Sequence, residues 1–78
     1  MTAFEKQCIR ETVSDAFGQL AEKDSDPEVR AVLQATWPTS MSKKFAKRIE
    51  IDDVMGFHAI ACREWSRCSK RWKREEGY

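Results

Sequence analysis

The chain has 78 residues, of which 14 are basic and 13 acidic, so its net charge is +1. We expect one small folded domain that lies outside the membrane and is not secreted, because no long apolar run and no basic-then-apolar N-terminal signal is present. An odd number of cysteines, three, predicts a reducing, intracellular location in the cytoplasm without disulfides.

The first predicted helix covers residues 2–23. Thr2, with Glu5 three residues later, has the spacing of a capping box, in which the two side chains satisfy free backbone amides at the helix start. Apolar side chains then recur at helical spacing, at Ile9, Val13, Ala16, Phe17 and Leu20. This pattern predicts one buried face and leaves Phe4 on the far side.

The second predicted helix covers residues 26–37. Asp26 is expected to cap it, Pro27 suits its first turn, and Pro38 ends it. The apolar stripe expected along this helix is Val29, Val32, Leu33, Thr36 and Trp37.

Two further helices are predicted, a short basic one over residues 42–50 and a long one over 54–75, with a turn at 51–53 between them. The hydroxyl side chains that could cap the short helix are Thr39, Ser40 and Ser42. No segment alternates between apolar and polar residues as a strand does. The expected fold class is therefore all-α, a small single-domain helical bundle (1–78) of three to four helices, the last one long and amphipathic.

The last predicted helix carries the clearest functional pattern. Its apolar face comprises Val54, Phe57, His58, Ala61, Trp65, Cys68 and Trp72. Six of the twelve residues 63–74 are Lys or Arg and only Glu64 is acidic, whereas a face that merely meets solvent usually mixes both signs. Charge also differs between the two parts of the chain, −3 over residues 1–38 and +4 over residues 39–78. This segregation indicates a contact surface.

We predict that this surface meets nucleic acid or an acidic protein surface. Its candidate residues are Lys43, Lys44, Lys47, Arg48, Arg63, Arg67, Lys70, Arg71, Trp72 and Arg74. Trp65 and Trp72 both fit the core by spacing, but little chain remains after Trp72 to cover it. A Trp beside arginines is typical of protein hot spots and of base-stacking platforms alike.

Catalytic and metal sites have little support in the sequence. His58 and Cys62 are four residues apart, but no further Cys or His at the right spacing completes a tetrahedral metal site. No third residue that would orient His58 against a nucleophilic Cys62 is evident, and no carboxylate pair suits acid–base chemistry. We therefore expect a non-enzyme without cofactor, metal or small-molecule substrate.

Two function classes stay open. In the first, the basic C-terminal helix contacts nucleic-acid phosphate, as in a regulator, and residues 43–60 form a loose helix-turn-helix in which Asp52 and Asp53 lie unfavourably close to phosphate. In the second, the protein is an adaptor or inhibitor, of the kind common in phages and mobile elements, that docks its basic, Trp-bearing helix on an acidic protein surface. We rank nucleic acid first, because clustered Lys and Arg most often meet phosphate.

The apolar face of the last helix needs a cover, and two covers are compatible with the sequence. Either the first two helices pack on it, or a second copy of the chain does so in a homodimer. We favour packing within one chain, since the first two helices each offer a single apolar stripe.

Overall fold

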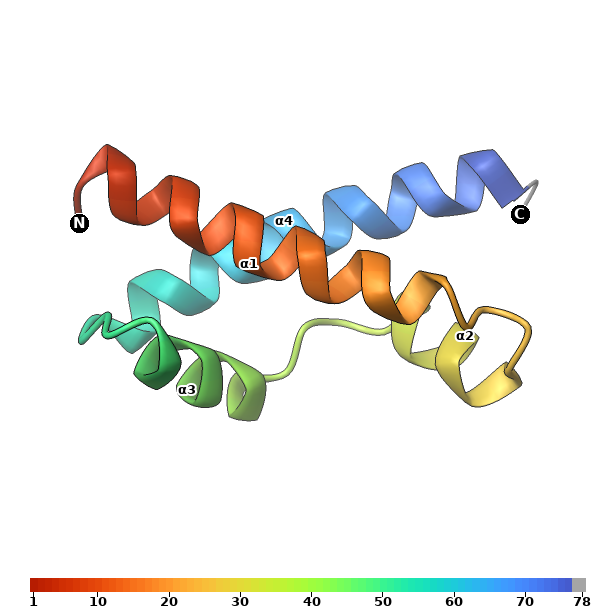
Figure 1. Cartoon of the computed structure of the whole chain (residues 1–78), viewed down its shortest axis with the longest axis horizontal. Coiled ribbons are helices and arrows are strands. Elements are labelled where there is room, and N and C mark those ends of the chain that lie inside the picture. Colours follow the sequence, from red (N-terminus) through yellow and green to blue (C-terminus); the bar gives the residue numbers. More distant parts are fainter. Residues whose placement is uncertain (77–78) are drawn as a thin grey trace.

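The computed structural model describes residues 1–76, which form four helices and no strand (Figure 1). The helices are α1 (Ala3–Ala21), α2 (Pro27–Gln34), α3 (Thr39–Arg48) and α4 (Val54–Glu76). α1 crosses α4, α3 packs on the first part of α4, and α2 packs on α1. The predicted all-α bundle with a long last helix is confirmed. None of the helices in residues 1–76 combines the length and apolar character that a bilayer span requires.

Side-chain caps define the starts of three helices. The capping box of α1 is confirmed, because Thr2 Oγ1 accepts the Glu5 N–H at 3.1 Å and Glu5 Oε1 accepts the Thr2 N–H at 3.0 Å. Asp26 and Asp53 each accept a backbone N–H in the first turn of α2 and α4, at 2.9 Å in both cases. These bonds satisfy amides that have no partner within the helix.

α2 is shorter than the sequence pattern predicts. It ends at Gln34, and the three residues up to Trp37 leave the helix. The residue before a proline is driven out of helical conformation, and Pro38 acts on Trp37 in this way. The extended segment lets the Ala35 carbonyl accept the Trp65 indole N–H at 3.0 Å. Trp37 enters the core with 2% exposure, as a residue of the linker and not of a helical stripe.

α3 begins three residues earlier than predicted, at Thr39, and ends at Arg48. Pro38 is its N-cap, and no side chain caps it, so the expected hydroxyl caps are wrong. Ser42, one of those expected caps, is instead fully buried in the second turn of the helix.

A Schellman motif closes α3 before the turn into α4. The Glu50 N–H donates to the Lys47 carbonyl at 3.3 Å, and the Ile51 N–H donates to the Ala46 carbonyl at 2.9 Å. Glu50 lies between these two bonds in the left-handed region, with φ 58°. Glycine is the usual residue at this position, because it has no Cβ to clash with the backbone.

We expect Glu50→Gly to raise the free energy of unfolding by up to about 1 kcal/mol. Releasing the left-handed strain is worth about 1–2 kcal/mol, and the larger entropy of glycine in the unfolded chain offsets about half of it. Urea denaturation measures the change. Glu22→Gly is the control, because Glu22 caps α1 with φ −62°, and glycine there should destabilise. A loss of stability in Glu50→Gly would contradict the Schellman assignment.

The core lies where α1 crosses α4 and extends to α3. Its apolar residues are Ile9, Val13, Phe17, Leu33, Trp37, Ala46, Ile51, Phe57, Ala61, Trp65 and Trp72. Trp65 contacts Phe17 and Trp37, with ring centroids 4.9 Å and 5.2 Å apart. Aromatic rings thus supply volume that a chain with few aliphatic residues lacks. The apolar face of α4 is covered within one chain.

Candidate nucleic-acid interface

The ten predicted contact residues fall into two groups on different helices. Lys43, Lys44, Lys47 and Arg48 are exposed on α3, and the other six belong to α4. Figure 1 shows α3 beside the first part of α4, whereas the last turns of α4 extend toward the opposite end of the molecule. The cations of the α4 group differ in their pairing.

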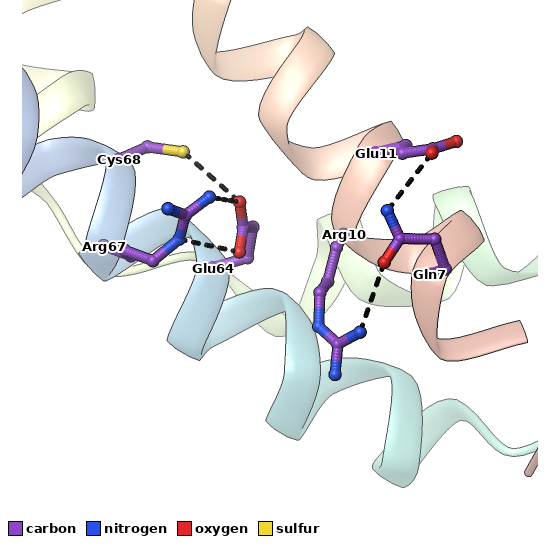
Figure 2. Close-up of polar contacts among 6 residues, drawn as sticks. All are labelled: Gln7, Arg10, Glu11, Glu64, Arg67 and Cys68. Carbon is purple, nitrogen blue, oxygen red and sulfur yellow. Dashed lines mark hydrogen bonds and ion pairs between the residues drawn. The ribbon is translucent and has the colours of Figure 1, made fainter. Parts of the chain in front are cut away.

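Two α4 arginines are held by carboxylates. Arg67 donates to Glu64 through Nη2 at 2.6 Å and through Nε at 3.1 Å (Figure 2). Glu64 is only 6% exposed, so Arg67 supplies the counter-charge that a buried carboxylate requires. Donating this hydrogen bond to Glu64 stabilises the charged guanidinium and raises the pKa of Arg67. Arg71 pairs with Glu75 on the exposed surface, with Nε 3.3 Å from Oε1.

The Arg67–Glu64 pair lies beside polar side chains of α1 (Figure 2). Gln7 Nε2 donates to Glu11 Oε1 at 3.2 Å, and Arg10 Nη1 donates to Gln7 Oε1 at 3.4 Å. The groove between the two helices has a volume of about 460 Å³ and is lined by Gln7, Arg10, Glu11, Ser14, Asp15, Arg63, Glu64 and Arg67. Acids and bases are mixed along it, so this groove is poorly suited to a polyanion.

The remaining predicted cations of α4 are Arg63, Lys70 and Arg74, which we call the α4 row. All three are exposed, and none of them forms an ion pair with a carboxylate of residues 1–76. At about 100° per residue they fall within about 40° of one another around the helix. They span about 16 Å along its axis, at about 1.5 Å per residue. The row therefore presents three positive charges without an ion-pair partner among residues 1–76 on one face of the helix.

Trp72 does not belong to this surface. Its ring is 6% exposed, and its indole N–H donates to Asp24 Oδ2 at 3.3 Å. This bond ties the end of α4 to the turn after α1. Trp72 was a candidate contact residue because little of the chain follows it. Its burial instead matches the core position that its spacing from Trp65 indicated.

A polar network that the sequence did not reveal joins the linker, α3 and α4. The Trp37 indole N–H donates to Ser42 Oγ at 2.8 Å, and Ser42 Oγ lies 2.6 Å from His58 Nδ1. Cys62 Sγ lies 3.3 Å from His58 Nε2. Burial of Ser42 could have been inferred from the sequence, because Ser42 lies one turn before Ala46 on the inward face of α3.

This network positions side chains of the linker, α3 and α4, but it does not make Cys62 a reactive nucleophile. Ser42 orients His58 through this contact, whereas the sequence pattern showed no residue in that role. Burial raises the pKa of the Cys62 thiol, however, which keeps the sulfur protonated and weakly nucleophilic at neutral pH. Within residues 1–76, no three His, Cys, Asp or Glu side chains gather closely enough to hold a metal ion.

A small recess, which we call the linker recess, lies between α4 and the segment that follows α2. Its volume is about 200 Å³, and it is lined by Gln34, Ala35, Thr36, Trp37, Cys62, Trp65, Ser66, Ser69, Lys70 and Lys73. Two lysines and no carboxylate are among these residues. Sequence reasoning missed the recess because it placed residues 35–37 inside a helix, and it left Lys73 out of the candidate set.

Comparison with known proteins adds no relative. No protein-family model matches the chain, and neither curated proteins nor solved structures gave a match.

Proposed function

We propose that this protein is a non-catalytic nucleic-acid-binding protein, a regulator that contacts the phosphate backbone through the α4 row. The observation that carries the proposal is that Arg63, Lys70 and Arg74 share one helix face without a carboxylate partner among residues 1–76. Unpaired Lys and Arg gain most from phosphate, because binding releases the counterions that are condensed on the nucleic acid. The α3 cations Lys43, Lys44, Lys47 and Arg48 add positive charge for the same polyanion.

Phosphate contact is favoured over reading of base sequence. In a helix-turn-helix, the first turn of the second helix meets the base edges. Here that end of α4 is preceded by Asp52 and Asp53, both exposed, which repel phosphate. The α4 row begins about 14 Å further along the helix. Burial of Trp72 also removes the ring that would have stacked on bases.

The salt dependence of binding tests the proposal. The three phosphate contacts of the α4 row should contribute about −2.7 to the slope of log K against log salt on duplex DNA, at about −0.9 per contact. In Arg63→Ala/Arg74→Ala, the slope should become shallower by about 1.8, with weaker binding at every salt concentration. Fluorescence anisotropy with a labelled duplex of arbitrary sequence measures both quantities.

Lys6→Ala/Lys23→Ala is the matched control, because it removes two exposed positive charges that lie outside both groups of candidate cations. Its slope should stay close to that of the wild type. Equal slopes in the two double variants would refute a specific role of the α4 row. The melting temperature of Arg63→Ala/Arg74→Ala should equal that of the wild type or be slightly higher. Alanine favours a helix, and the repulsion between Arg74 and Lys70 is removed.

A protein-interaction role is the second candidate, and one observation favours it. Phe4 is 77% exposed, Met55 is 83% exposed and Met1 is 43% exposed. α1 and α4 both begin at the same end of the molecule (Figure 1), and a methyl group placed on Gly56 would lie 3.1 Å from Met1 Cε. Exposed apolar side chains of this size often mark protein contacts. Capture from lysate with and without nuclease separates the roles, because a stoichiometric protein partner that resists nuclease would establish the second.

A further inference from the structure

We infer that the linker recess binds a terminal phosphate monoester of a nucleic-acid strand. The inference rests on the proposed function and deepens it, because it names a strand end as the group that this part of the surface recognises. Two features of the recess support it, the hydroxyl of Ser69 and the positive charge of the lysines that line the recess.

Ser69 is 7% exposed, yet its hydroxyl forms no hydrogen bond with any group of residues 1–76. A buried hydroxyl in a helix can donate to the backbone carbonyl one turn earlier, as Thr12 does to the Cys8 carbonyl at 2.8 Å. Ser69 Oγ is not sealed in the core either, since no enclosed polar side-chain atom of the described residues lacks a partner. The hydroxyl therefore faces the recess and is available to a ligand.

The charge and donors of the recess favour an anion. Lys70 and Lys73 stand on its wall, no Asp or Glu lines it, and its other polar side chains are Gln34, Thr36 and Ser66. A phosphate monoester carries about −1.5 to −2 charge near neutral pH and three acceptor oxygens, which suits two ammonium groups and several neutral donors. A carboxylate carries half that charge and fewer acceptors.

The position of the recess indicates a strand end and not the backbone between two nucleotides. The recess has a volume of about 200 Å³ and the linker closes it on one side, so it has room for one phosphate group but not for the nucleotides on both sides of a phosphodiester. Lys70 belongs both to the recess and to the α4 row. A strand whose end enters the recess can therefore continue along Arg63 or Arg74 without a break in positive charge.

The experiment compares duplexes of one sequence that carry a 5′-phosphate, a 3′-phosphate or only hydroxyl ends. We expect one phosphorylated end to raise affinity about tenfold over hydroxyl ends at moderate salt, since charged hydrogen bonds are about twice as strong as neutral ones. In Ser69→Ala/Lys73→Ala this preference should fall below about twofold, while affinity for the hydroxyl duplex changes far less. Anisotropy titrations give both values.

Lys23→Ala/Ser25→Ala is the matched control, since it removes an exposed lysine and an exposed serine hydroxyl away from the recess. It should keep the tenfold preference. Inorganic phosphate and a nucleoside monophosphate serve as competitors. They should bring the affinity for the phosphorylated duplex down to that for the hydroxyl duplex.

The outcomes separate this inference from the proposed function. Equal affinity for all three duplexes, with binding still dependent on Arg63 and Arg74, would overturn the strand-end site and leave backbone binding intact. Binding of free phosphate without a preference for phosphorylated ends would also overturn it. If the wild type binds none of the duplexes at low salt, both the proposed function and the strand-end site fail.

Discussion

Trp65→Ala is expected to leave the chain unfolded at room temperature. Trp65 is 4% exposed, packs between Phe17 and Trp37, and donates its indole N–H to the Ala35 carbonyl at 3.0 Å. Replacing a buried Trp by Ala costs about 3–5 kcal/mol. A single core in a domain of this size supplies about the same amount, so little or no stability remains. Loss of the helical circular dichroism signal is the readout.

Two further variants keep this prediction falsifiable. Phe4→Ala removes an aromatic ring that is 77% exposed, and its stability should change by less than about 0.5 kcal/mol. Trp65→Phe retains a ring but loses the hydrogen bond to Ala35, so it should fold with reduced stability. If Trp65→Ala folds normally and sedimentation shows a change from dimer to monomer, Trp65 lies in a seam between two chains.

Ser42→Ala is expected to lower the free energy of unfolding by about 2–3 kcal/mol, a large loss for so small a change in volume. The substitution removes the acceptor of the Trp37 indole N–H and the partner of His58 Nδ1. Trp37 is 2% exposed and Ser42 is fully buried, so no water replaces the lost bond at the indole. A buried group without its partner costs about 1–3 kcal/mol. Urea denaturation followed by circular dichroism measures the loss.

The control is Ser40→Ala, which makes the same chemical change at an exposed position of α3 and should shift stability by less than about 0.5 kcal/mol. A double-mutant cycle then isolates the indole bond. In a Trp37→Phe background the donor is absent, so Ser42→Ala should cost about 1 kcal/mol less than it does in the wild type. Equal costs in both backgrounds would show that the bond contributes nothing.

Local chemistry explains why much of the fold could be predicted. Thr2 with Glu5 and Asp26 with Pro27 act within one turn, so the starts of α1 and α2 follow from adjacent residues. The end of α2 could not be found in this way. Pro38 acts only on Trp37, so it permits a helix up to Thr36 as readily as an end at Gln34. The choice depends on partners distant in sequence, above all the Trp65 indole N–H that donates to the Ala35 carbonyl.

The sequence predicted which basic residues the candidate site contains, but not which of them form ion pairs with carboxylates. The run of Lys and Arg placed a basic face on the last helix, and Arg63, Lys70 and Arg74 are exposed there. Whether an arginine is held in an ion pair depends on the burial of its carboxylate partner, and the sequence does not show that Glu64 is buried. Because Glu64 is buried, Arg67 serves the fold and is less available to a partner.

Binding in the linker recess is coupled to the local stability of the short helix α2. α2 has eight residues, buries only Leu33 fully and packs on α1, so it opens at a lower free energy than the crossing of α1 and α4. The outer wall of the recess comprises Gln34, the last residue of α2, and the three residues that follow it. A ligand that fills the recess would bind only the closed arrangement. Occupancy and the local folding of α2 are then thermodynamically linked, so each stabilises the other.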